Sequence, residues 1–108
     1  MVPRPPAIRS IPAMTTIDPR PTLHVYRRTD CELCDETRLL LQAALEERAS
    51  RGERVPIVRE VDIDTDPSLE ERFGSRIPVL SLDGHELELA TSGRQVRAFL
   101  DRTLGRLV

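Results

Sequence analysis

The chain has 108 residues and a mass of 12.2 kDa, enough for one domain with a single hydrophobic core. Its 16 basic and 18 acidic residues give a net charge of −2, whereas a nucleic-acid-binding module would show a basic excess. No apolar run approaches the roughly 18 residues of a membrane-spanning helix, and two cysteines are too few for a disulfide-rich secreted scaffold. We therefore expect a cytoplasmic monomer that binds neither nucleic acid nor membranes.

Residues 1–22 differ from the rest of the chain because they contain most of its prolines. Proline fixes φ and lacks a backbone N–H donor, so this stretch suits neither a helix interior nor a central strand. We predict an extended, largely disordered tail, followed by one domain at residues 23–108. Met14 allows a second interpretation, in which translation starts there and residues 1–13 are absent from the native protein.

From residue 23 onward, apolar residues recur with periods that predict alternating strands and helices. A β-branched and aromatic run predicts a strand at 23–26, and a helical period predicts a long helix from about 31 to 51, ended by Gly52. A second strand is expected at 57–63, with an apolar set of Ile57, Val58, Val61 and Ile63. The buried stripe of the helix is expected to be Cys34, Leu41 and Leu45, with Leu33, Leu40 and Ala44 beside it.

The acidic run after the second strand has two interpretations. Asp62, Asp64 and Asp66 imitate the start of a calcium-binding loop, but Pro67 stands where that loop needs a glycine. An aspartate followed by proline is instead typical of an N-cap and the first helical turn. We therefore predict a short helix that ends at Gly74, and no calcium site.

A hairpin follows the short helix. Asp83-Gly84 stands between predicted strands at 78–82 and 85–89, and this dipeptide is a strong signal for a two-residue turn. The fourth strand alternates apolar and acidic residues. We expect Leu87 and Leu89 to face inward.

A last amphipathic helix is expected over residues 93–107, capped by Thr91 or Ser92. The predicted order is therefore β-α-β-α-β-β-α. The first β-α-β unit requires a parallel, right-handed crossover, and the hairpin requires an antiparallel pair. These constraints predict a three-layer α/β/α domain around a small mixed four-stranded sheet.

Cys31 and Cys34 lie directly after the first strand, at the start of the long helix. A C-x-x-C motif beside a βαβ pattern in an intracellular protein is typical of redox chemistry. Positions i and i+3 share a helix face, which allows a disulfide, and the N–H groups at the helix start favour a thiolate. We expect Cys31 to attack a disulfide and the more buried Cys34 to resolve the mixed disulfide.

Charges near Cys31 act in opposite directions. The neighbours that favour its thiolate are Arg27 and Arg28. The neighbours that oppose it are Asp30, Glu32, Asp35 and Glu36. Asp30 or Thr29 is also suited to cap the helix. We predict that the helix start prevails and stabilises the Cys31 thiolate relative to that of a free cysteine.

Other interpretations of the cysteine pair involve metal binding or simple packing. A structural zinc site needs four ligands, and the chain offers only the two cysteines with His24 and His85, which lie far apart in sequence. We therefore expect no metal site within one chain. A metal centre shared by two chains, and a redox-inactive pair that only packs, stay open.

Three segments together resemble a known family. They are residues 26–34 with the C-x-x-C motif, residues 60–64 before a short helix, and Arg76-Ile77-Pro78-Val79 before a hairpin. In this combination the chain resembles a glutaredoxin-like member of the thioredoxin-fold superfamily from residue 23 to about residue 107. The resemblance implies a thioredoxin-like fold. It also implies a thiol–disulfide oxidoreductase that reduces protein disulfides or low-molecular-weight mixed disulfides.

The resemblance also implies roles for residues outside the motif. Pro78 would be a cis-proline facing the cysteines, and the backbone of Ile77 would pair with an extended substrate. Arg28 would help to bind the carboxylate of glutathione, and the amides near Ser92 and Gly93 would hold a carboxylate at a helix start. No cofactor would be bound, and glutathione, another small thiol or a reductase would reset the pair.

Two features differ from typical glutaredoxins. Glu32-Leu33 replaces the Pro-Tyr dipeptide between the cysteines, and residues 91–95 hold one glycine and no acidic residue where a Gly-Gly turn and paired acids are usual. These differences favour an alternative function, namely a redox-inactive module that keeps the fold and binds proteins through the same groove.

Overall fold

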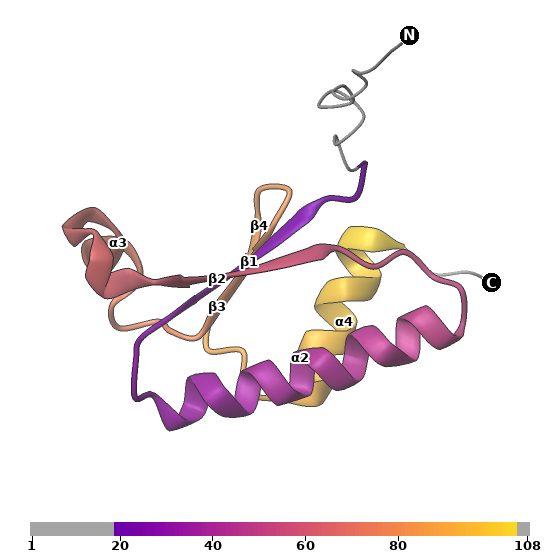
Figure 1. Cartoon of the computed structure of the whole chain (residues 1–108), viewed down its shortest axis with the longest axis horizontal. Helices are drawn as coiled ribbons and strands as arrows, with labels where there is room; N and C mark the ends of the chain where they lie inside the picture. The colour runs from indigo at the N-terminus through magenta and orange to yellow at the C-terminus, as the bar shows by residue number, and fades with distance from the viewer. Residues whose placement is uncertain (1–18, 106–108) are drawn as a thin grey trace, which may run out of the picture.

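The computed structural model describes residues 19–105 (Figure 1). Most of the predicted tail (residues 1–18) and the end of the predicted last helix (residues 106–108) lie outside this range. The elements are β1 (Thr22–Arg27), α2 (Glu32–Ser50), β2 (Ile57–Asp62), the 3-10 turn η2 (Ile63–Thr65), α3 (Pro67–Phe73), β3 (Val79–Leu82), β4 (His85–Leu87) and α4 (Gly93–Leu104). The predicted order of strands and helices is confirmed. Between residues 19 and 105, every helix is too short or too polar to cross a membrane.

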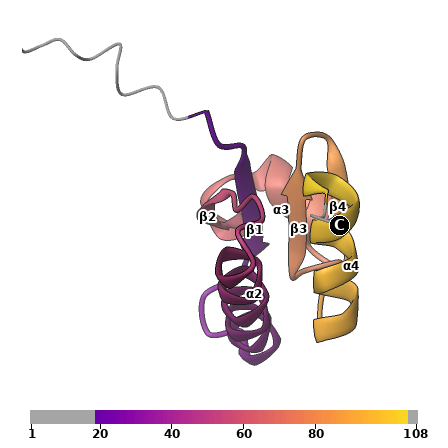
Figure 2. The ribbon, with the colours of Figure 1, turned by 90° about the vertical axis from the view of Figure 1, so that its right-hand side faces the viewer.

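The four strands form one mixed sheet in the order β2-β1-β3-β4. β1 and β2 run parallel, as the predicted crossover requires, while β3 is antiparallel to both β1 and β4. Helices α2 and α4 pack side by side against one face (Figure 2). Helix α3 lies at the end of the sheet where β1 leads into α2 (Figure 1). The cysteine motif and α3 therefore lie at the same end of the sheet.

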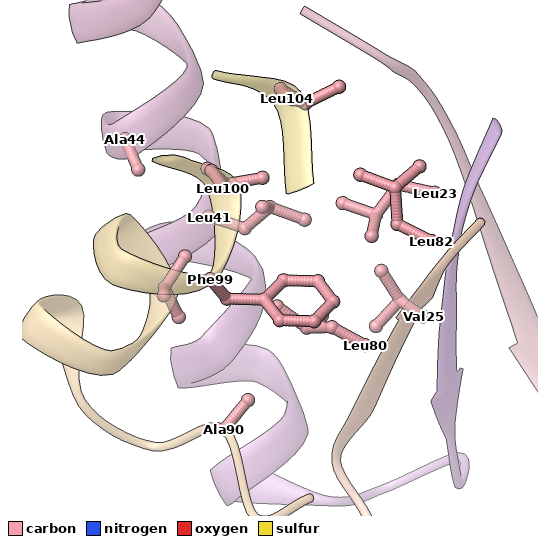
Figure 3. Packing of buried hydrophobic residues seen from close by; sticks show 11 residues of the cluster. Leu23, Val25, Leu41, Ala44, Leu80, Leu82, Ala90, Phe99, Leu100 and Leu104 are labelled. Carbon is pink, nitrogen blue, oxygen red and sulfur yellow. The ribbon is translucent and has the colours of Figure 1, made fainter. Parts of the chain in front are cut away.

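Alternation along the strands divides the apolar residues between two clusters. The larger cluster joins alternate residues of β1 and β3 to α2 and α4, and Figure 3 shows the ring of Phe99 between the helices and Val25 and Leu80. The smaller cluster, on the opposite face, contains Ile63, Phe73 and Val79, with Tyr26, Leu69 and Ile77 against it. Because α3 belongs only to the smaller cluster, it covers the second face near the cysteine motif. The predicted three layers are confirmed.

The hairpin and the helix caps follow the predicted turn chemistry. Asp83 and Gly84 both have positive φ, 51° and 82°, as a type I′ turn requires. Asp66 caps α3 by accepting a hydrogen bond from the Ser68 N–H, and Ser92 caps α4. These local signals were sufficient because each depends on residues adjacent in sequence.

Three apolar residues are more exposed than expected. The prediction that Leu89 faces inward is wrong: β4 ends at Leu87, and Leu89 adopts a φ of 48° with half of its surface exposed. Val58 is 40% exposed because β2 is an edge strand. Leu33 is 50% exposed because it points away from the buried stripe of α2.

The buried stripe of α2 contains two polar residues that hydrophobic periodicity does not reveal. Its buried members are Cys34, Thr37, Leu41, Ala44 and Arg48. The Arg48 guanidinium donates to the carbonyls of Arg54 and Gly105 and to the carboxylate of Asp101, and it lies 3.6 Å from buried Glu53. Arg48 therefore ties the end of α2 to the end of α4 through a hydrogen bond from each of its three guanidinium nitrogens.

We expect Arg48→Met to lower the free energy of unfolding by about 3 kcal/mol, because it removes the buried cation beside Glu53 and the donor to Asp101 and to the carbonyls of Arg54 and Gly105. Urea unfolding followed by circular dichroism measures this change. Arg38→Met is the matched control, since Arg38 is exposed on the same helix and its ion pair with Glu60 spans 3.9 Å. The control should lose about 0.5 kcal/mol or less. Equal losses in both variants would contradict the role assigned to Arg48.

Candidate functional site

Cys31 caps helix α2 with its own sulfur. The residue has extended backbone angles, and its Sγ accepts a hydrogen bond from the Cys34 N–H at 3.1 Å. Asp30 precedes it with a φ of 59°, in the left-handed region, where the chain turns from β1 into the helix. The expectation that Asp30 or Thr29 caps the helix is wrong, since the Thr29 hydroxyl donates to Asp62 instead. One otherwise unpaired N–H of the helix start is thus directed at the sulfur.

The two cysteines form a disulfide across the first turn of α2, with their Cα atoms 5.2 Å apart. Cys34 is fully buried, whereas Cys31 is partly exposed. The predicted difference in burial is confirmed. A molecule that approaches from solvent therefore meets the sulfur of Cys31 first.

The Ile77–Pro78 peptide bond is cis. The carbonyl of Pro78 accepts a hydrogen bond from the Ala90 N–H at 3.0 Å, and the Ala90 carbonyl accepts one from the Thr37 hydroxyl at 2.6 Å. Thr37 lies one turn after Cys34 on the same buried stripe. These two bonds connect the helix that carries the cysteines to the proline segment before β3.

Sequence reasoning missed Thr37. Its hydroxyl is fully buried and bonded 53 residues along the chain, so hydrophobic periodicity passes over it. The available signal was its position three residues after Cys34, on the face of the helix that carries the second cysteine.

Arg28 is committed to contacts within the chain. Its guanidinium donates to Asp64 at 2.7 Å, to Glu70 at 2.5 Å and to the Gly74 carbonyl at 3.1 Å. These partners belong to η2 and to α3 and its C-cap. Arg28 therefore joins the loop before Cys31 to the short helix on the other face of the sheet. Its expected role in binding a substrate carboxylate stays a prediction.

Arg27 is also paired with carboxylates. It donates to Asp35 at 2.8 Å and lies 3.6 Å from Glu60. Arg27, Asp35 and Glu60 help to line a hollow of about 440 Å³ beside the loop that precedes the cysteine motif. Both cations predicted beside Cys31, Arg27 and Arg28, are thus paired with carboxylates of the same chain.

Hydrogen bonds lower the pKa of three carboxyl groups near this end of the sheet. The pKa of Glu70 is lowered mainly by its hydrogen bond from Arg28. The pKa of Asp62 is lowered mainly by the Thr29 hydroxyl, and that of Asp66 by the N–H and hydroxyl of Ser68. All three groups therefore hold their negative charge below the usual pH range of a carboxyl.

The start of α4 is the other predicted carboxylate site. The Ser92 hydroxyl accepts from the Gln95 N–H at 3.3 Å, and a Cβ added at Gly93 would lie 3.7 Å from Leu40 of α2. The start of α4 therefore lies beside α2, some two turns after the cysteines. The predicted binding of a carboxylate by Ser92 and Gly93 stays a prediction.

The site thus brings together the cysteine pair and, through hydrogen bonds, the cis-proline segment. Arg28 lies on the side of α3. Between residues 19 and 105, no three His, Cys, Asp or Glu side chains are arranged to hold a metal ion.

The arrangement is a disulfide at a helix start, next to a parallel β-α-β unit, with a cis-proline before an antiparallel hairpin. The sequence profile of the glutaredoxin-like domain (DUF836) matches residues 22–103. The chain belongs to this glutaredoxin-like family. The predicted resemblance is therefore confirmed over nearly all of the described residues.

Two solved structures share the fold of this glutaredoxin-like domain. The target protein XcR50 from X. campestris is 37% identical, with a TM-score of 0.60 over 74% of this chain and 96% of that one. A structure described as a malarial protein is 15% identical, with a TM-score of 0.55 over 79% of this chain and 98% of that one, and it shows the fold alone. Among curated proteins, no sequence matches the chain.

We expect Thr37→Val to lower the free energy of unfolding of this glutaredoxin-like domain by about 2 kcal/mol, because the buried Ala90 carbonyl loses its donor. Urea unfolding of the oxidised protein measures the change. Thr103→Val is the matched control: its hydroxyl donates only to carbonyls of its own helix, at Phe99 and Leu100. A loss no larger than that of the control would show that the bond from Thr37 does not hold the segment.

Arg28→Gln should raise the pKa of Glu70 towards its usual value, because the hydrogen bond from Arg28 is the largest cause of its depression. A depressed pKa in the folded state contributes stability at neutral pH that is lost as the pH falls through the folded value. The variant should therefore lose less stability than the wild type on acidification. Side-chain carboxyl NMR titration measures the pKa.

Asp66 is the internal control for that titration, since the cause of its lowered pKa is Ser68 rather than Arg28. Its pKa should stay lowered in the Arg28→Gln protein. A Glu70 pKa that does not move, or that moves together with the pKa of Asp66, would contradict the assigned ion pair.

Proposed function

We propose that the protein is a thiol–disulfide oxidoreductase whose attacking atom is the Cys31 Sγ. The observation that carries this proposal is the hydrogen bond from the Cys34 N–H to that sulfur, within a pair that forms a disulfide. A hydrogen bond to a charged acceptor contributes about 1.5–3 kcal/mol, and the helix start adds a favourable field. Both effects are larger for a thiolate than for a thiol, so they favour the nucleophilic form at neutral pH.

The reaction begins with the reduced pair. The Cys31 thiolate attacks one sulfur of a substrate disulfide, forms a mixed disulfide, and expels the other substrate sulfur as a thiolate. Cys34 then loses its proton and attacks the Cys31 Sγ. The Cys31–Cys34 disulfide forms, the bond to the substrate breaks, and the second substrate thiol leaves. Two electrons pass from the cysteine pair to the substrate disulfide.

The backbone of Ile77 supports an extended substrate beside the cysteines. Neither its N–H nor its carbonyl is hydrogen-bonded within residues 19–105, and Pro78 follows through a cis bond. Two unused backbone groups just before β3 suit pairing with a substrate strand. We assign the amides at Ser92 and Gly93, at the start of α4, to the carboxylate of a substrate or small thiol.

The oxidised pair needs a reductant. Two equivalents of a low-molecular-weight thiol such as glutathione, or a reductase, would return both electrons and release the corresponding disulfide. The reducing cytoplasm supplies such thiols, and we place the protein there as a monomer without a bound cofactor. Its substrates are then protein disulfides or mixed disulfides of small thiols.

Cys34→Ser should trap the substrate, because the resolving sulfur is gone while the attacking sulfur remains. We expect a near-stoichiometric mixed disulfide between Cys31 and a model peptide disulfide, detected by intact-protein mass spectrometry. Cys31→Ser is the matched control and should accumulate no adduct, because Cys34 is buried.

An adduct on Cys34 would reverse the two roles. The absence of any adduct, together with no reduction of the peptide disulfide by the wild type, would favour a redox-inactive binding module. The exposed Glu32 between the cysteines is the feature that favours this second candidate, since a carboxylate opposes a neighbouring thiolate.

A further inference from the structure

The two cations that precede the cysteine motif in sequence, Arg27 and Arg28, are paired with carboxylates. Arg28 is bound by Asp64 and Glu70, and it also donates a hydrogen bond to the Gly74 carbonyl. A substrate carboxylate would have to displace groups that are held in place by the fold and therefore act at a high effective concentration. Asp64 and Glu70 therefore compete with any incoming anion for Arg28.

Carboxylates without such compensation flank the attacking cysteine. Asp30 and Glu32 stand on either side of Cys31, are exposed, and have no cationic partner among the described residues. The two carboxylates on Arg28 carry one more negative charge than that guanidinium neutralises. The approach to the Cys31 sulfur is therefore negatively charged.

Resting on the proposed function, we propose that the protein reacts faster with disulfides of basic protein segments than with anionic disulfides such as those of glutathione. The reacting site is the cysteine pair, and Asp64 and Glu70 are its specificity-determining residues. They hold Arg28 away from an incoming carboxylate and add negative charge near the site. A substrate with a cation beside its disulfide is attracted by the same charges.

Three peptides that differ only in charge test this inference. Acetylated Arg-Cys-Gly, Gln-Cys-Gly and Glu-Cys-Gly amides are each joined to 2-thiopyridine through a disulfide. Attack by the Cys31 thiolate on the peptide sulfur releases 2-thiopyridone with the electron pair, and Cys34 then releases the peptide thiol. The rate of 2-thiopyridone release from the full-length reduced protein reports the first step for each peptide.

At low salt, we expect the Arg peptide to react about five-fold faster than the Glu peptide. A few unpaired charges that act across several ångströms of water change a reaction rate by roughly this factor. The ratio should fall towards one in about 1 M salt. The double variant Asp64→Asn, Glu70→Gln should lower the Arg-to-Glu rate ratio below the wild-type value, while Asp30 and Glu32 keep it above one. Glu71→Gln, on the same helix but without a bond to Arg28, is the matched control and should keep the wild-type ratio.

The Gln peptide distinguishes a failure of the proposed oxidoreductase function from a failure of the charge selectivity alone. If it does not react, the proposed oxidoreductase function fails, and this inference fails with it. If it reacts but the Arg and Glu peptides react equally in the wild type, the charge selectivity alone is overturned. A ratio that Glu71→Gln changes as much as the double variant would also overturn the role of Asp64 and Glu70.

Discussion

The hydrogen bond from the Cys34 N–H to the Cys31 sulfur requires that α2 begin at the residue after Cys31. A left-handed Asp30 turns the chain out of β1, and Thr29 is held by Asp62, so neither residue takes the cap position. The bond is also expected to outweigh the nearby carboxylates that oppose a Cys31 thiolate. A hydrogen bond to an ionised sulfur contributes about 1.5–3 kcal/mol, whereas an exposed carboxylate several ångströms away in water contributes less than about 1 kcal/mol. Under the proposed function, we therefore expect the reduced Cys31 to favour its thiolate even though acidic residues surround it.

The start of α2 is held from two sides. On the side of α4, Thr37 reaches the Ala90 carbonyl, and Ala90 in turn reaches Pro78, which fixes the proline segment relative to the helix. On the side of α3, Arg28 joins the loop before Cys31 to Glu70. Under the proposed function, we expect this support to hold the cysteine pair in place through a cycle of reduction and oxidation. We infer that the same ion pair, which supports the loop, also changes the charge that a substrate would meet.

The sequence predicted what depends on local signals: the order of the elements, the hairpin turn, and the cysteine pair at a helix start. It did not predict Thr37 or Arg48 within the buried stripe, because hydrophobic periodicity treats polar residues as solvent-facing. It misplaced Leu89 because an alternating pattern does not show where a strand stops. The partners of Arg28 lie 36 and 42 residues along the chain, and only the tertiary fold brings them to it. Arg28, expected to bind a substrate carboxylate, is therefore paired with Asp64 and Glu70 in the structure.

The central claim is that the helix start activates Cys31 while burial restrains Cys34. Brief alkylation of the fully reduced protein with iodoacetamide at neutral pH tests it most directly, with the modified residue located by mass spectrometry of peptides. The account predicts that Cys31 is alkylated first, faster than a cysteine in an unstructured peptide, while Cys34 is modified slowly. Alkylation of Cys34 at an equal or higher rate, or a Cys31 no more reactive than the peptide cysteine, would contradict it.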